Sequence, residues 1–232
     1  MTIEVRDSAI IISATKYSEN SLIIKLLSEN NGIYSGFVKG GGSKKQLLNY
    51  QVANIVDFIW RSRTEDGLGY FKIESKKSYL ANIIFNKTKL QSVKTIFELI
   101  QRNIMERENC KELFCKLEDF LQSSLDNDNL FLSKYINLEL EFLRIIGYGL
   151  DLESCALGGD SSNLHFVSPR TGRAASKEKG LQYKNKLLKL PKFLYQKTYI
   201  NTSDEDIKAG LDLTGFFLKK YLNYERSWSN SN

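Results

Sequence analysis

The sequence has little of the residue types on which catalysis and metal binding depend. Its 232 residues include one histidine, three cysteines and two prolines. An odd number of cysteines fits a reducing compartment with no disulfide framework. No stretch approaches the roughly 18 uninterrupted apolar residues of a membrane-spanning helix, and the mean hydropathy is −0.33. The first residues also lack the basic and apolar regions of a secretory signal, so we expect a cytoplasmic protein.

The few candidate catalytic groups do not form a set. His165 is the single histidine, and no G-x-S-x-G, H-E-x-x-H or Rossmann glycine signature occurs. Cys155 has no second cysteine three residues on, because position 158 is glycine. A structural zinc site needs four Cys or His ligands. The sequence therefore predicts a protein that is not an enzyme, with no catalytic residue, no bound metal and no cofactor.

Positive charge is what the sequence has in excess. The net charge is +6, and the segment 164–198 holds nine Lys or Arg against one acid, Glu178. Such a run is often only a solvated face. It can also be a surface that binds phosphates, since Lys and Arg gain affinity for a polyanion by releasing its counterions. We favour the phosphate-binding interpretation, because the run lacks interspersed acids and lies on a segment marked by Gly, Pro and Ser.

The first third of the chain is typical of short strands. Apolar runs at 9–12, 22–27, 32–38, 54–60 and 68–74 are separated by turn residues. Five short strands in about 80 residues predict a small closed sheet, with an OB-type barrel as the leading candidate and an SH3-like barrel as the alternative. We therefore expect an α+β protein with a nucleic-acid-binding domain over residues 1–80.

The loop after the third expected strand contains three glycines, Gly40 to Gly42, and three lysines, Lys39, Lys44 and Lys45. Such a backbone can approach a phosphate closely, although a plain flexible hairpin loop explains the composition equally well. Nearby aromatic residues suit base stacking, but most of them are expected in the core. They are Tyr17, Tyr34, Phe37 and Tyr50.

From residue 81 onward the apolar period becomes helical. Stripes at three- and four-residue steps run through 90–104, 113–125 and 135–145. Thr202 and Glu205 have capping-box spacing, so a last helix is expected from Ser203 or Asp204 to about Tyr224. Residues 81–232 are thus expected to form an all-helical domain, interrupted by a loop-rich basic insert at about 150–185.

Several motifs together resemble one family. The residues that carry the resemblance are Gly149-Leu150-Asp151-Leu152 with Cys155, Phe166-Val167-Ser168-Pro169-Arg170, Gly172-Arg173-Ala174, Gly180 with Tyr183, and in the N-terminal part Tyr17, Glu19, Ser21 and Val38-Lys39-Gly40. In these positions the sequence is similar to the RecO family of bacterial recombination mediators. The resemblance covers nearly the whole chain.

The resemblance implies an N-terminal OB-fold, a C-terminal helical domain and a role in the RecF-type pathway of DNA repair. It implies binding of single- and double-stranded DNA, annealing of complementary strands, and loading of RecA, together with RecR, onto DNA coated by single-strand-binding protein (SSB). It also implies recognition of the acidic SSB tail, for which we expect a basic-rimmed apolar groove between helices, and a cytoplasmic, nucleoid-associated location. Many members carry a four-cysteine zinc module at the insert. Here only Cys155 persists, so we expect a degenerate module without zinc.

We expect two cationic surfaces to hold DNA strands by their phosphates and to leave the base edges free. The residues expected to contact phosphate are Lys39, Lys44, Lys45, Arg170 and Arg173, with Lys177 and Lys179 as secondary candidates. A competing hypothesis is a protein-interaction adaptor whose basic face meets acidic partner segments. A nuclease ranks third, because the sequence offers no acidic metal cluster.

Overall fold

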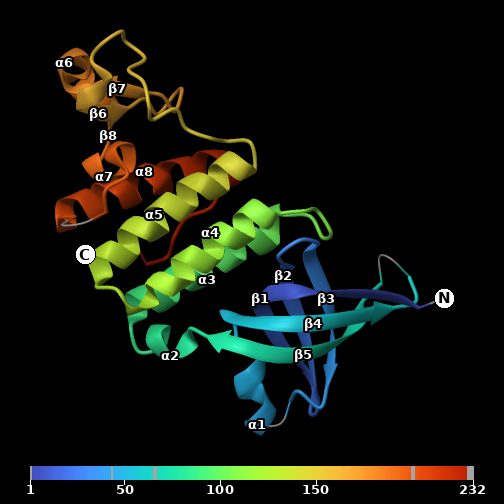
Figure 1. Ribbon diagram of the computed structural model, residues 1–232. Coiled ribbons are helices and arrows are strands. Elements are labelled where there is room, and N and C mark those ends of the chain that lie inside the picture. The colour runs from blue at the N-terminus through green and yellow to red at the C-terminus, as the bar shows by residue number, and fades with distance from the viewer. Residues whose placement is uncertain (1, 43, 65–66, 200–201, 229–232) are drawn as a thin grey trace. The chain divides into compact units, whose positions relative to one another are not determined.

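The computed structural model describes residues 2–42, 44–64, 67–199 and 202–228 (Figure 1). It contains a five-stranded sheet followed mainly by helices, which confirms the expected α+β class. The chain divides into two compact units, Met1–Ser124 and Leu125–Asn232. The domain boundary expected at residue 80 stays a prediction. None of the described helices is long and apolar enough to cross a membrane.

The sheet of the first unit closes on itself. Its strands are β1 (Ile3–Ser18), β2 (Ser21–Ser28), β3 (Gly32–Lys39), β4 (Asn54–Ser62) and β5 (Gly69–Ser78). They pair in the order β1-β2-β3-β5-β4, and β4 pairs back to β1, so the strands form a closed ring. All pairs are antiparallel except β3 with β5. That this ring is an OB-type barrel stays a prediction.

Alternation along the strands separates a core face from a solvent face. In β2, Leu22, Ile24 and Leu26 are buried, whereas Ile23 and Lys25 between them are half-buried. This period of two is the pattern of a strand with one face in a core. The ring encloses an aromatic and aliphatic core whose members include Tyr34, Val38, Val56, Phe58, Trp60 and Phe71.

The first unit also contains three helices, α2 (Leu80–Ile83), α3 (Lys87–Asn103) and α4 (Lys111–Gln122). The short α1 (Lys44–Leu47) and the 3₁₀ turn η1 (Leu48–Tyr50) lie between β3 and β4, and the 3₁₀ turn η2 (Ser123–Leu125) spans the boundary to the second unit. The Asn86 side chain begins α3 by accepting the Lys89 N–H at 3.0 Å. Val93, Phe97 and Ile100 are buried on one face of α3, which confirms the helical stripe expected there.

The second unit is built on two long helices, α5 (Asp128–Ile145) and α8 (Asp204–Leu222). They run parallel, because Asn129 at the start of α5 donates to Asp204 at 2.8 Å, and Tyr148 just past the end of α5 stacks on Tyr221 near the end of α8. The α8 cap is Ser203, whose hydroxyl accepts the Asp206 N–H. The capping box expected at Thr202 was therefore one residue out, although the helix begins where it was predicted.

The insert between α5 and α8 contains a small sheet of its own. Its elements are η3 (Ser161–Asn163), β6 (Leu164–Val167), β7 (Ala174–Ser176), α6 (Lys177–Gly180), η4 (Leu181–Lys186), β8 (Leu188–Lys189) and α7 (Lys192–Gln196). The strands pair in the order β7-β6-β8. The turn between β6 and β7 carries the Ser168–Arg173 motif, so the sheet holds the most basic part of the sequence in a defined conformation.

Candidate nucleic-acid interface

Three aromatic rings form a contact chain on the outer face of the five-stranded ring. The centroids of Tyr17 and Phe37 are 5.0 Å apart, and those of Phe37 and Tyr70 are 5.8 Å apart. Tyr17 is 65% exposed and Tyr70 is 51% exposed, which is unusual for residues of this size. We call Tyr17, Phe37 and Tyr70 the aromatic strip.

The parallel junction of β3 and β5 builds this strip. The two strands pair at only two positions, Gly36 with Gly69 and Phe37 with Tyr70. A Cβ at Gly36 would lie 2.8 Å from the Phe71 ring, so the junction needs glycine there. Phe37 and Tyr70 point outward because their strand neighbours belong to the core. Sequence reasoning named Tyr17 and Phe37 but missed Tyr70, since its place beside Phe37 depends on a non-local register.

Tyr34 and Tyr50, the other two aromatic residues considered for stacking, do not join the strip. Tyr34 is buried, and the Arg107 guanidinium lies 4.7 Å from its ring centroid. Burial raises the pKa of the Tyr34 hydroxyl. Tyr50 is half-buried and packs against the core of the ring. Both are structural residues, so the expectation that most of the four lie in the core holds for these two but not for Tyr17 and Phe37.

Lys39 ends β3 beside the strip. It is exposed, and its Nζ lies 4.8 Å from the centroid of the Tyr70 ring. A cation held next to exposed rings is the arrangement that binds a phosphate while the neighbouring bases stack. Lys44 and Lys45 begin α1, but their side chains lie outside what the structure describes. Of the three lysines expected in this loop, the structure therefore places one.

In the second unit, the turn between β6 and β7 presents Arg170 and Arg173, both exposed. Gly172 in this turn has φ of 70°. Lys220 of α8 holds the turn by donating to the carbonyls of Pro169 at 2.8 Å and Arg170 at 3.0 Å.

Arg173 is partly neutralised. Its Nε lies 3.3 Å from a carboxylate oxygen of Asp151. Asp151 lies outside the basic run, so a count of charges along that run did not reveal the pair. Arg170 is therefore the stronger candidate for phosphate contact on this turn.

Lys177 and Lys179 are exposed in α6, which the Ser176 side chain caps. Lys177 also faces His165 of β6. Burial lowers the pKa of the His165 imidazole, and the positive charges of Lys177, Lys189 and Lys192 lower it further. The imidazole therefore titrates below its usual range and is neutral at pH 7. These residues form a second group of cations on the small sheet, with His165 as an uncharged member.

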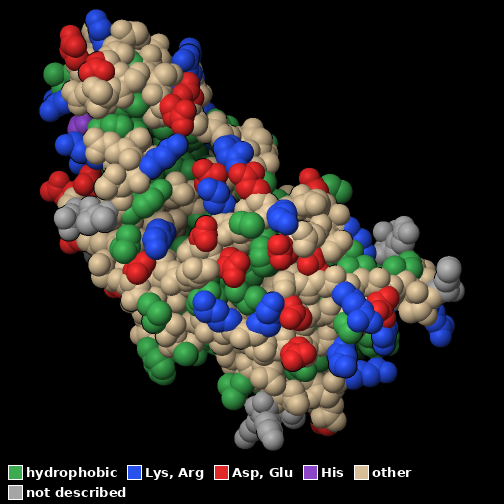
Figure 2. Space-filling model, in the orientation of Figure 1, with side chains coloured by type: hydrophobic (Ala, Val, Ile, Leu, Met, Phe, Trp, Pro, Cys, Tyr) green, Lys and Arg blue, Asp and Glu red, His purple; other side chains and the backbone are tan. Residues whose placement is uncertain are grey.

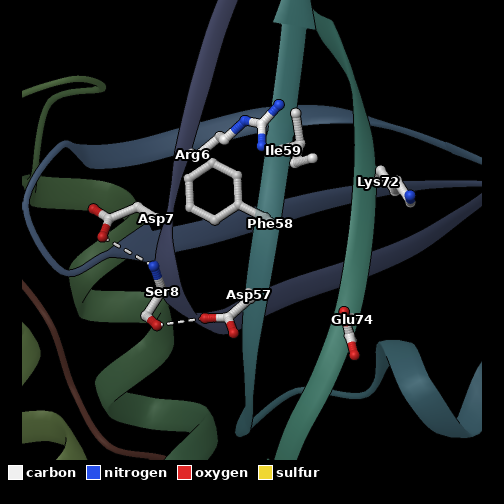
Figure 3. Close-up of a pocket in the computed structure, with 8 residues that line it drawn as sticks. All are labelled: Arg6, Asp7, Ser8, Asp57, Phe58, Ile59, Lys72 and Glu74. Carbon is white, nitrogen blue, oxygen red and sulfur yellow. Dashed lines mark hydrogen bonds between the residues drawn. The ribbon is translucent and has the colours of Figure 1, made fainter.

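A hollow over strands β1, β4 and β5 of the first unit does not suit phosphate. It encloses about 460 Å³ and is lined by Arg6, Asp7, Ser8, Asp57, Phe58, Ile59, Lys72 and Glu74 (Figure 3). Three acids face two bases, so the lining is net negative. Figure 2 shows Lys and Arg side chains over the nearby end of β4 with acidic side chains close by.

The two aspartates of this hollow are held as structural anions. Burial raises the pKa of Asp7, but hydrogen bonds from Ser28, Asn30 and Asn31 outweigh it and the pKa is lowered. The Ser8 hydroxyl, 2.6 Å away, lowers the pKa of Asp57, and Lys76 lowers it further. Both carboxylates are therefore ionised at neutral pH and already hydrogen-bonded, which leaves them unsuited to general base catalysis.

The residues around Cys155 do not fit a zinc ion. The Cys155 thiol accepts the Ser176 N–H at 3.2 Å, a hydrogen bond that by itself neither supplies nor excludes a metal ligand. Burial raises the pKa of this thiol, but hydrogen bonds led by that of the Ser176 N–H outweigh it and lower the pKa. Among the described residues, no three His, Cys, Asp or Glu side chains lie close enough to hold a metal. The structure thus offers no four-ligand set at the insert.

Two hollows in the second unit bear on the expected SSB-tail groove. One, of about 320 Å³, is lined by Asn137, Leu140, Glu141, Arg144, Leu150, Asp151, Leu152, Glu153, Leu194, Tyr195 and Lys197. The other, of about 370 Å³, is lined by Leu188, Leu211, Asp212, Gly215, Phe216, Lys219, Glu225 and Arg226. The first has three acids against two bases and the second two against two. Neither has the basic rim that an acidic tail requires, so neither supports the expected groove, which stays a prediction with no assigned position.

Comparison with known proteins agrees with the fold. The model of the recombination protein O N-terminal region matches residues 1–79, and that of its C-terminal region matches residues 88–230. The chain is 42% identical over 220 residues to the DNA repair protein RecO of Rickettsia canadensis, covering 94% of this chain and 89% of the relative. It is 39% identical over 217 residues to the DNA repair protein RecO of Orientia tsutsugamushi (strain Ikeda), covering 94% and 90%.

These matches, with the closed sheet and the helical unit that carries the basic insert, define a DNA repair protein of mixed α+β structure. The chain belongs to the RecO family, as the resemblance of its motifs indicated. Its role therefore lies in DNA repair and recombination.

Proposed function

We propose that this protein binds single- and double-stranded DNA, anneals complementary strands and, with RecR, helps to load RecA onto DNA coated by SSB. The aromatic strip with Lys39 is the observation that carries the proposal. Exposed rings beside a cation bind single strands without regard to sequence, because every base has a face that can stack. Arg170 on the insert adds a cation to which no acid is paired in the described residues.

The proposed activity needs no catalytic group. Annealing requires that two polyanions approach each other while their base edges stay free to pair, and cations bound to phosphates reduce the repulsion between them. The protein would act as a scaffold and not as an enzyme, in the cytoplasm and in association with the nucleoid. Recognition of the SSB tail and of RecR belongs to the same proposal on the strength of family membership alone.

Binding across a salt series tests the proposal. Each phosphate contact on a single strand contributes about 0.7 to the slope of log K against log salt. The Arg170→Ala/Arg173→Ala double variant should lower the slope by about 0.7 to 1.4, toward the smaller value if Asp151 already neutralises Arg173. The matched control is Lys94→Ala/Lys208→Ala, which removes the same charge from exposed positions on α3 and α8.

Three outcomes would count against the proposal, the first of them only against its placement of the insert. An unchanged slope in the arginine double variant would remove the insert from the interface. Absence of salt-dependent DNA binding by the wild-type protein would favour the adaptor hypothesis, in which the basic surfaces meet acidic protein segments. Magnesium-dependent cleavage of DNA by the pure protein would instead revive the nuclease hypothesis.

A further inference from the structure

Three aromatic rings of the second unit form a stack that runs from the core to solvent. The ring of Phe217 is nearly parallel to that of Tyr221, at 21° and 5.8 Å, and the ring of Tyr221 is parallel to that of Tyr148, at 10° and 4.6 Å. Phe217 is fully buried, Tyr221 is half-buried and Tyr148 is 41% exposed. The stack therefore ends on an accessible tyrosine ring.

The backbone fixes the position of this terminal ring. Gly147 follows α5 with φ of 91°, a conformation that glycine adopts without strain. The Tyr148 N–H then donates to the Leu143 carbonyl at 2.7 Å, and the Gly147 N–H donates to the Arg144 carbonyl at 3.0 Å. These two bonds are those of a Schellman motif. Tyr148 is consequently held in place before any ligand arrives.

Cations lie against the same stack. The Lys220 Nζ is 4.9 Å from the centroid of Tyr221 and 5.7 Å from that of Phe217. The same Nζ binds the carbonyl of Arg170, so the turn that presents Arg170 is tied to the helix that presents Tyr221. Arg144, Arg173 and Lys219 nearby are each paired with an acid. Arg170 and Lys220 therefore supply the positive charge that is not balanced by a carboxylate in the described part of this site.

We propose that the exposed face of Tyr148, at the open end of the stack that Tyr221 supports, is a stacking site for an unpaired nucleobase of single-stranded DNA, with Arg170 on its phosphate. This site is additional to the aromatic strip of the first unit, and the inference rests on the proposed function. A base adds to the open end of a prebuilt stack without the cost of ordering the rings. An exposed ring, with the Lys220 ammonium against the next ring of the stack and Arg170 on the turn that Lys220 holds, matches one nucleotide better than it matches an acidic peptide, which has no ring to place on Tyr148 at each residue.

The experiment compares two oligonucleotides of equal length and charge, one of thymidines and one with abasic tetrahydrofuran sites in place of the bases. Stacking on an aromatic side chain is worth about 1 to 3 kcal/mol per base. Tyr148→Ala should therefore weaken binding of the thymidine oligonucleotide by about 5- to 150-fold and leave binding of the abasic one unchanged. Tyr148→Phe keeps the ring and should bind as the wild type does.

Tyr183→Ala is the matched control, because Tyr183 is a 47% exposed tyrosine of the same unit. This variant should bind both oligonucleotides as the wild type does.

If Tyr148→Ala does not fold, ultraviolet crosslinking of the wild-type chain to an oligonucleotide with 5-iodouracil replaces the variant, and the crosslink should map to Tyr148 or Tyr221. Three results would overturn this site and leave the proposed function intact. They are an equal loss of affinity for both oligonucleotides in Tyr148→Ala, no loss of affinity for either, and crosslinks confined to the aromatic strip. A Tyr148→Ala loss seen only with an acidic peptide would also overturn it. Failure of the wild type to bind either oligonucleotide would instead refute the proposed function itself.

Discussion

Arg226 is expected to contribute strongly to the stability of the second unit. It follows α8, is 5% exposed and forms an ion pair with Glu139, which is fully buried in α5. The same carboxylate accepts hydrogen bonds from the Tyr135 hydroxyl at 2.5 Å and from the Thr214 hydroxyl at 2.5 Å. The nearby carboxylate raises the pKa of Arg226 even though burial lowers it. The Arg226 guanidinium is thus charged, and both partners are removed from water.

Replacing Arg226 with Met keeps much of the volume but leaves the Glu139 carboxylate buried without its cation. Breaking a buried ion pair in this way costs about 3 to 5 kcal/mol, a large share of a typical stability of 5 to 15 kcal/mol. The further change Glu139→Gln removes the stranded charge while keeping an oxygen that can accept from Tyr135 and Thr214. The double variant should therefore recover more than half of the loss.

Hydrogen exchange measured by mass spectrometry suits this test, because opening of the two units can be followed separately. In the Arg226→Met variant, peptides from α5 and α8 should lose protection, whereas peptides from β1 to β5 serve as an internal control. A loss of less than about 1 kcal/mol of protection in α5 of the single variant, or no recovery on adding Glu139→Gln, would contradict this role of Arg226.

Two further predictions concern a turn and a carboxylate. Gly172→Ala places a Cβ 2.8 Å from Leu150 at a φ of 70°, so the variant should lose about 1 to 2 kcal/mol of folding stability. DNA binding should also weaken, because this turn carries Arg170. A melting temperature equal to that of the wild type would contradict the prediction. The hydrogen bonds that lower the Asp7 pKa stabilise the fold above the unfolded-state pKa, and this stability is lost as the pH falls through the folded pKa. Asp7→Asn should thus be less stable than the wild type at pH 7, and the difference in urea midpoint should shrink as the pH falls below the ordinary aspartate pKa of 3.8. A difference that stays constant as the pH falls would count against this role of Asp7.

The sequence predicted those features that local periodicity determines. The strand period of two and the helical stripes located the sheet and the long helices. The ends of strands were less visible: β1 extends over Ile3–Ser18, although only residues 9–12 form an apolar run. Residues 3–6 alternate between half-buried and exposed, and residues 14–18 are all exposed, so neither outer part contains an apolar run of strand length.

The candidate interface was only partly predictable, because its geometry depends on contacts distant in sequence. Tyr70 lies beside Phe37 through a parallel strand pair, and Tyr148 meets Tyr221 through the parallel packing of two helices. Charge counting located Arg170 and Arg173 but not the Asp151 carboxylate that faces one of them. Residue types along a segment indicate what it can bind, whereas only the fold shows which charges remain unbalanced.

The most direct test of the proposed function is whether the pure protein anneals complementary strands that SSB already coats. The proposed function predicts annealing that slows as salt is raised, that is weakened by Lys39→Ala combined with Arg170→Ala, and that Lys94→Ala/Lys208→Ala leaves unchanged. Annealing that is independent of salt and of Lys39 and Arg170, or no annealing of coated strands at all, would contradict it.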